Sequence, residues 1–131
     1  MAERILVVED DDTTRKLIVS MLSSANYDCR EAGDGLEALA VLDSGAEFEL
    51  VVSNLMMPGL DGIGLLERLK EKYSDIPVVM ESGVTDVTEV IAAFRNGAQD
   101  YLLKPFKREQ LLAMVRRALD RQRLKIEQRE H

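Results

Sequence analysis

The sequence has few of the residues that form covalent or metal cross-links. Its 131 residues include one cysteine, Cys29, and one histidine, His131. A single cysteine cannot form an internal disulfide, so we expect Cys29 to be a small core residue of a protein in a reducing compartment. Metal centres built from cysteine and histidine ligands are excluded as well.

Long apolar runs and an excess of positive charge are also absent. No segment approaches the roughly 18 consecutive apolar residues of a membrane-spanning helix, and no apolar signal segment follows Met1. The chain has 17 Lys and Arg against 24 Asp and Glu, a formal net charge of −7, which repels nucleic acid and anionic membranes. We therefore expect a cytoplasmic protein that does not contact nucleic acid or membrane directly.

The sequence does contain a regular alternation of short apolar runs with segments of helical periodicity. A chain of this length, 46% hydrophobic, suits one globular domain. The alternation predicts a parallel sheet covered on both faces by helices, with ligands binding at the carboxyl ends of the strands. We expect the last helix to begin near Arg108, and strands at residues 5–8, 28–32, 50–53, 77–80 or a little beyond, and 100–103.

The last helical segment continues beyond the length that a compact domain needs. Apolar or uncharged residues recur there at a/d spacing over about two heptads, at Leu112, Val115, Leu119, Gln122 and Ile126. So short a repeat is compatible with a homodimeric coiled coil and equally with a solvated helix end. We expect residues 1–120 to form the domain and residues 121–131 to form a helical extension.

Acidic residues follow the first predicted strand, at positions 9–12. One of them can cap the helix that comes next. Glu9 and Asp10 repel each other unless a cation lies between them. Mg²⁺ prefers carboxylate and carbonyl oxygens, and Glu9, Asp10, the side chain of Asn54 and the backbone carbonyl of Met56 offer such oxygens at one edge of the sheet.

Ser82 and Lys104 follow the fourth and fifth predicted strands. Taken singly, a serine there can simply begin a loop, and a lysine at a strand end is usually a solvated charge. Together with a divalent-ion site, a hydroxyl donor and an ammonium are the groups that surround a transferring phosphoryl group. Pro105 follows Lys104, and a proline at this place can lock a turn through a cis bond.

The segments at residues 5–12, 56–62, 82–83 and 100–106 together resemble the receiver domain of bacterial two-component response regulators. The resemblance covers about residues 4–120. It implies a doubly wound, flavodoxin-like α/β fold, with five parallel strands and five helices in three α/β/α layers. It further implies a Mg²⁺ site at Glu9 and Asp10, phosphoryl contacts from Ser82 and Lys104, and switch residues at Ser82 and Tyr101.

Asn54 stands where this family places its phosphoryl-accepting aspartate. A neutral amide has no anionic oxygen with which to attack phosphorus. The resemblance therefore implies a non-enzymatic receiver that works with a histidine kinase or phosphotransfer protein but is not phosphorylated. Its final residues resemble the linkers that join receivers to a C-terminal output domain, and a separate downstream protein is the other expected partner. Asn54 is compatible with a natural pseudo-receiver and with an engineered substitution.

Two other functional classes match parts of the sequence. Residues 10–14 resemble the Asp-x-Asp-x-Thr pattern of haloacid-dehalogenase-like, Mg²⁺-dependent phosphohydrolases, but only a terminal helix with Glu109 and Asp120 follows Lys104 where that family needs a further acidic pair. The other class is a phosphorylation-independent ligand- or partner-binding module of flavodoxin-like topology. No Gly-x-Gly-x-x-Gly or Walker loop is present to support nucleotide binding.

Overall fold

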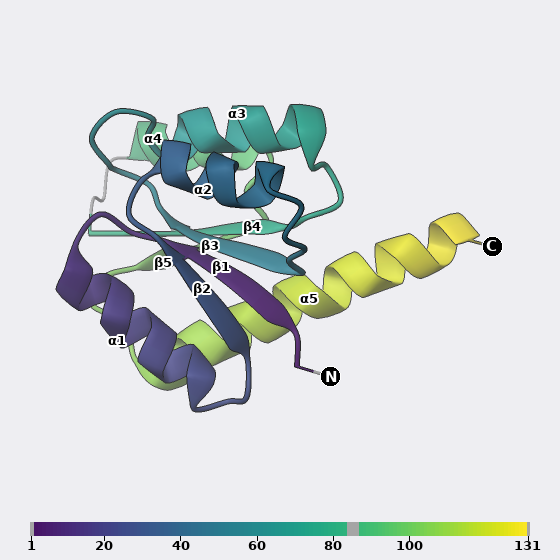
Figure 1. The fold of residues 1–131 in the computed structure, drawn as a ribbon, viewed down its shortest axis with the longest axis horizontal. Helices are drawn as coiled ribbons and strands as arrows, with labels where there is room; N and C mark the ends of the chain where they lie inside the picture. The colour runs from purple at the N-terminus through teal and green to yellow at the C-terminus, as the bar shows by residue number, and fades with distance from the viewer. Residues whose placement is uncertain (1, 84–86, 131) are drawn as a thin grey trace.

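The structure, a computed structural model, describes residues 2–83 and 87–130. The strands within these ranges are β1 (Arg4–Val8), β2 (Asp28–Ala32), β3 (Leu50–Asn54), β4 (Val78–Ser82) and β5 (Asp100–Leu103) (Figure 1). The helices are α1 (Asp12–Ser23), α2 (Gly35–Asp43), α3 (Gly62–Lys72), α4 (Val87–Arg95) and α5 (Arg108–Glu130). All the predicted strands are present. β3 extends one residue further than predicted, to include Asn54, and β4 continues a little beyond Met80, as expected, to include Ser82.

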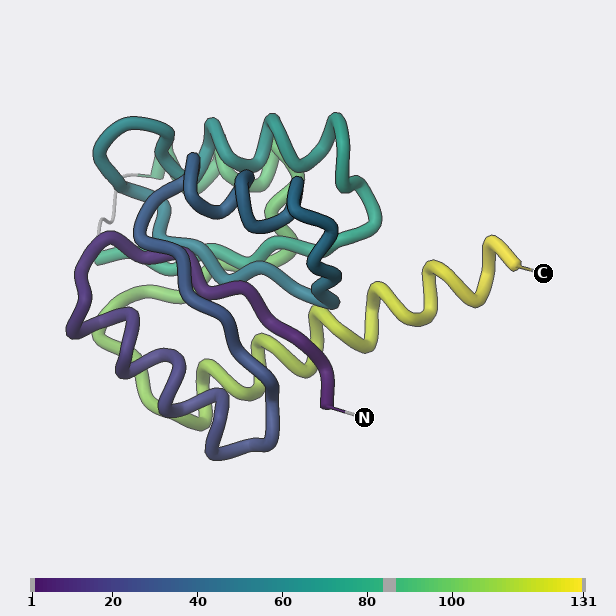
Figure 2. Tube along the Cα trace, viewed as in Figure 1, coloured from purple at the N-terminus to yellow at the C-terminus, as the bar shows by residue number. Residues whose placement is uncertain are grey.

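The five strands form one parallel sheet in the order β2-β1-β3-β4-β5. Helices α1 and α5 cover one face, and α2, α3 and α4 cover the other, as the ribbon and the Cα trace both show (Figures 1 and 2). From β1 the chain passes to β2 on one side and then returns to β3 on the other. The carboxyl ends of β1 and β3 therefore meet at the topological switch point, where this class of sheet binds ligands.

Each face of the sheet has its own apolar core because successive strand residues point to opposite faces. On β1, Ile5 and Val7 pack with α1 and α5, whereas Leu6 and Val8 pack beneath α2 and α3. Cys29 is half-buried against the first of these cores. Burial raises the pKa of the Cys29 thiol to about 11, as befits a small packing residue.

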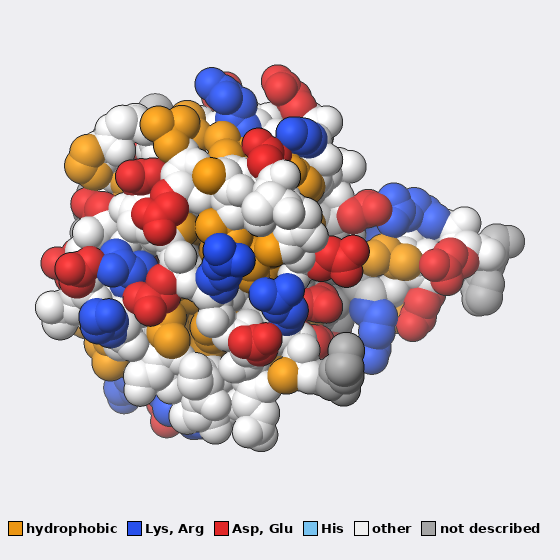
Figure 3. Space-filling view, viewed as in Figure 1, with side chains coloured by type: hydrophobic (Ala, Val, Ile, Leu, Met, Phe, Trp, Pro, Cys, Tyr) orange, Lys and Arg blue, Asp and Glu red, His pale blue; other side chains and the backbone are white. Residues whose placement is uncertain are grey.

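The first half of helix α5 packs against the sheet, and its second half projects beyond the sheet (Figure 1). Val115 and Leu119, two of the a/d positions, are buried in the core of the domain. The expected repeat is thus partly explained by packing within the chain. Figure 3 shows Lys, Arg, Asp and Glu side chains around the projecting end. None of the described helices is both long enough and apolar enough to span a bilayer.

The start of α3 packs directly against the end of β3. Asp61 caps the helix by accepting a hydrogen bond from Gly64 N at 2.9 Å. The Gly62 backbone N donates to Leu55 O at 2.9 Å. A Cβ at position 62 would lie 2.7 Å from the carbonyl oxygen of Asn54, so only glycine permits this approach. Gly62 therefore helps to fix the backbone at residue 54.

Candidate functional site

The predicted polar residues gather at the carboxyl edge of the sheet. Glu9 and Asp10 follow β1, and Asn54 is the last residue of β3. Register pairing places Asn54 beside Glu81 of β4 and Ser82 beside Leu103 of β5. The fold thus brings together groups that are as many as 95 positions apart in the sequence.

The Asn54 amide is the centre of this edge. Its Nδ2 atom donates to Glu9 Oε2 at 2.9 Å, to Asp10 Oδ1 at 3.1 Å and to Met56 O at 2.9 Å. The side chain is almost fully enclosed, with 7% of the residue exposed. The four positions expected to form a cation site, namely Glu9, Asp10, Asn54 and Met56, are therefore in direct contact. The Asn54 amide nitrogen hydrogen-bonds to each of the other three.

Lys104 contacts two buried carboxyl groups. Its Nζ donates to Glu9 Oε1 at 2.8 Å and lies 3.4 Å from Glu81 Oε2. Glu81 was not among the site residues expected from the sequence. The available signal was a glutamate directly after the apolar residues 78–80. In the structure, β4 is buried at all five positions and the Glu81 side chain is inaccessible to solvent. Within the described chain, Lys104 is therefore the one cation beside the Glu81 carboxyl group, and it lies at the outer limit of hydrogen-bond distance.

The two carboxyl groups have opposite pKa shifts. Burial raises the pKa of Glu81 to about 9, and the neighbouring Glu9 adds to this increase. Burial also acts to raise the pKa of Glu9, but the interactions of its carboxylate with Glu81, Lys104 and Asp10 outweigh burial and lower that pKa to about 2. The pKa of Lys104 is raised because these carboxyl groups overcome the effect of its burial. At neutral pH, Glu9 is ionised, Lys104 is charged and Glu81 retains its proton.

Ser82 and Tyr101 lie on the adjacent strands β4 and β5. Ser82 is buried, and its carbonyl oxygen accepts a hydrogen bond from Lys104 N at 2.8 Å. Tyr101 is half-buried against the core beneath α3 and α4. The Lys104–Pro105 bond is cis, as expected from the proline. The roles of Ser82 as a phosphoryl contact, and of Ser82 and Tyr101 as switch residues, stay predictions.

The other acids after β1 have structural partners. Asp11 caps α1 by accepting a hydrogen bond from Thr14 N at 2.8 Å, which confirms that one acid of this run is a helix cap. Asp12 pairs with Arg15, which also binds Glu31 at 2.9 Å. Glu9 and Asp10 are therefore the two acids of this run that face Asn54.

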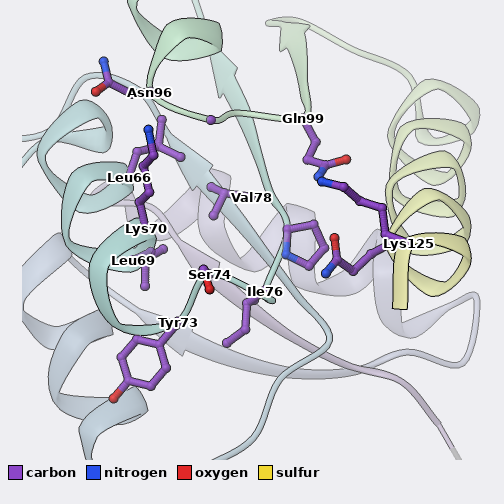
Figure 4. Close-up of a pocket in the computed structure, with 13 residues that line it drawn as sticks. Leu66, Leu69, Lys70, Tyr73, Ser74, Ile76, Val78, Asn96, Gln99 and Lys125 are labelled. Atoms are coloured by element: carbon purple, nitrogen blue, oxygen red, sulfur yellow. The ribbon is translucent and has the colours of Figure 1, made fainter. Parts of the chain in front are cut away.

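A separate hollow of about 290 Å³ lies near the start of β4 and β5, at the opposite edge of the sheet. Figure 4 shows its lining from α3, the following loop, the α4–β5 connection and α5, including Leu69, Ile76, Gln99 and Lys125. None of the acidic or lysine residues of the candidate site lines this hollow. The chemistry of Asn54 and its neighbours is therefore confined to the carboxyl edge.

Comparison with known proteins identifies the fold and its family. Residues 5–116 match the sequence model of the response regulator receiver domain family. The chain belongs to the response regulator receiver domain family. This receiver domain is 40% identical over 119 residues to a probable transcriptional regulator, ycf27, of Porphyridium aerugineum. It is 37% identical over 121 residues to the DNA-binding response regulator MtrA of Mycobacterium tuberculosis. These matches do not favour the phosphohydrolase alternative.

Solved structures agree with this assignment. The signal receiver domain of an HD domain-containing protein from Pseudomonas fluorescens superimposes with a TM-score of 0.88 at 30% identity, covering 94% of this receiver domain and 98% of that chain. NtrX from Brucella abortus gives a TM-score of 0.93 at 36% identity, covering 99% of this receiver domain and 29% of NtrX. Among the curated relatives, the alignment covers 91% of this chain and 49% of ycf27, and 92% of this chain and 52% of MtrA. The chain thus spans about half the length of these relatives.

Proposed function

We propose that this receiver domain signals through protein contacts without being phosphorylated, because Asn54 occupies the position of the phosphoryl acceptor. The observation that carries the proposal is the placement of Asn54 at the end of β3, in contact with Glu9, Asp10 and Met56 O and beside the Glu9–Lys104 pair. The site has the charged groups that support phosphoryl transfer, but the central side chain is a neutral amide. The domain itself is not an enzyme in this proposal.

Mg²⁺ is the cofactor that this site would take. The donor set fits a hard cation, since Glu9 and Asp10 offer carboxylate oxygens and Met56 offers a carbonyl oxygen. These three oxygens already converge on one atom, Asn54 Nδ2, at 2.9–3.1 Å. A bound cation would neutralise charge that develops on a phosphoryl group. We expect its affinity to be lower with Asn54 than with an aspartate at this position.

The partners proposed for the domain follow from its family. A histidine kinase or a phosphotransfer protein would dock at the carboxyl edge, where the site lies. The curated relatives include DNA-binding response regulators about twice as long as this chain, so we propose that the projecting end of α5 links the receiver to a C-terminal output domain or contacts a downstream protein (Figure 1). The net charge of −7 disfavours DNA contact by the receiver itself, and we place it in the cytoplasm.

The test is to restore the nucleophile. Incubation with acetyl phosphate and Mg²⁺ should leave the wild-type chain unmodified and should phosphorylate the Asn54→Asp variant, because the groups around residue 54 are already in place. Intact-mass spectrometry, before and after hydroxylamine cleavage of the acyl phosphate, measures both outcomes.

The matched control is Asn96→Asp, which makes the same substitution in the α4–β5 connection, away from the site. It should stay unmodified. Stoichiometric phosphate on an aspartate of the wild-type chain would contradict the proposal. An Asn54→Asp variant that is folded yet inert to acetyl phosphate and to a panel of histidine kinases would show that residue 54 is not the acceptor position.

A further inference from the structure

The Asn54 amide nitrogen lies among more acceptors than it can fully satisfy. An amide NH₂ group has two hydrogens, whereas Glu9 Oε2, Asp10 Oδ1 and Met56 O all lie within 3.1 Å of Nδ2. The opposite orientation of the amide would place its oxygen against these same three acceptors, two of them carboxylates. Electrostatics therefore fixes the nitrogen toward the acidic residues and the amide oxygen away from them.

We propose that the Asn54 amide nitrogen takes the place of the divalent cation, so that a cation can bind only when the Asn54 side chain leaves its present position. The inference rests on the proposed function, since it takes Glu9, Asp10 and Met56 O as the cation ligands. The oxygen lone pairs that accept the amide hydrogens are the ones that Mg²⁺ needs at about 2.1 Å. Asn54 is thus an internal competitor of the metal.

Removing the Asn54 side chain should change the Mg²⁺ affinity in opposite directions, depending on whether the amide competes with the ion or ligates it. If Asn54 only supplied a weak oxygen ligand, Asn54→Ala would bind Mg²⁺ less tightly than the wild-type chain. If the amide competes with the ion, Asn54→Ala binds Mg²⁺ more tightly, because no hydrogen bonds to Glu9 and Asp10 have to break first. Water replaces the lost side chain readily, since Mg²⁺ usually keeps several waters in protein sites.

The competition also predicts how each protein responds to the metal's removal. In the wild-type chain the amide neutralises part of the repulsion between Glu9 and Asp10, so stability should differ little between EDTA and Mg²⁺. In Asn54→Ala these carboxylates have lost that donor, although Lys104 still pairs with Glu9 at 2.8 Å. The melting temperature of Asn54→Ala should therefore be lower than that of the wild-type chain in EDTA and should rise when Mg²⁺ is added.

The experiment is a Mg²⁺ titration by calorimetry, together with thermal melts in EDTA and in Mg²⁺, on the full chain. The proteins are wild type, Asn54→Ala, Asn54→Ser and Asn54→Asp, with Asn96→Ala as the matched control away from the site. The serine variant provides a second test if the alanine variant is unfolded, because its side chain ends near the position of the asparagine Cγ. Asn54→Ala and Asn54→Ser should bind Mg²⁺ at least about tenfold more tightly than wild type, equivalent to about 1.4 kcal/mol. Asn96→Ala should match wild type.

The outcomes separate the inference from the proposed function. If Asn54→Asp binds Mg²⁺ but the folded alanine and serine variants bind as weakly as wild type or more weakly, the competition is refuted and the proposed cation site stands. If Asn54→Asp shows no Mg²⁺ binding either, the cation assignment of Glu9 and Asp10 fails, and the inference fails with it. Equal melting-temperature shifts in Mg²⁺ for wild type and Asn54→Ala would also overturn the inference.

Discussion

Burial of Glu81 should make the stability of this domain fall as the pH rises through neutrality. The folded-state pKa of Glu81 is raised from 4.5 to about 9 by burial and by Glu9. Between these two values the folded chain holds the proton and the unfolded chain releases it, so the stabilisation is complete below pH 4.5 and is lost as the pH approaches 9. Glu9 titrates outside this window, because its lowered pKa, about 2, makes its contribution fall only as the pH is lowered from 4.5.

The expected size of the effect follows from the difference between the unfolded-state and folded-state pKa values of Glu81, 4.5 and about 9, which bound the pH window. Each pH unit inside it changes the free energy of unfolding by at most about 1.4 kcal/mol, so a rise of three units, from pH 5 to pH 8, gives roughly 4 kcal/mol. Local relaxation and water entry reduce the penalty of a buried charge in real proteins. We expect Glu81 to account for about 2–4 kcal/mol of stability lost over this interval.

The assay is urea unfolding of wild type and Glu81→Leu at pH 5 and pH 8. The leucine variant removes the titrating group and leaves Lys104 paired with Glu9, so it should lose about 2–4 kcal/mol less than wild type between the two pH values. Val79→Ala is the control, since it removes core volume on the same face of β4 and should destabilise equally at both pH values. Parallel pH profiles for wild type and Glu81→Leu would refute the assignment of a proton to Glu81.

Two further predictions test how α3 supports residue 54. Asp61→Ala should lower the free energy of unfolding by about 1 kcal/mol because Gly64 N loses its cap, whereas Asp61→Asn should lose much less; equal losses in urea titrations would contradict the capping role. Gly62→Ala should cost about 1–3 kcal/mol, because its Cβ would meet the Asn54 carbonyl oxygen at 2.7 Å. Gly45→Ala is the control, because its Cβ would have open space around it and would introduce only backbone strain at φ 95°. Nuclear magnetic resonance shifts at Asn54 should therefore change in Gly62→Ala but not in Gly45→Ala.

Periodicity in the sequence predicted a parallel sheet with helices on both faces and the edge at which the site lies, whereas the doubly wound, five-stranded fold was implied by the resemblance to receiver domains. Apolar runs such as residues 5–8 and 50–52 are uniformly buried because a parallel sheet is covered on both faces, so their residue types indicate the layer arrangement directly. Since all parallel strands end at one edge, Glu9, Asp10, Asn54 and Lys104 could be placed together before any contact was known. Local signals of this kind do not depend on the partner strand.

The pairings within the site were decided only by the tertiary structure. Asn54 and Glu9 are 45 positions apart, and Lys104 and Glu9 are 95 apart, so no local pattern specifies which atoms meet. The position of Glu81 opposite Asn54, and its burial beside Lys104, depend on the register of β3 with β4. The a/d spacing of α5 was ambiguous for the same reason, because Val115 and Leu119 suit a partner helix and a sheet face equally well. In the structure, Val115 and Leu119 pack against the face of the sheet that α1 also covers, so they belong to the domain core. The sequence could not show this, because burial depends on neighbours that are distant in the chain.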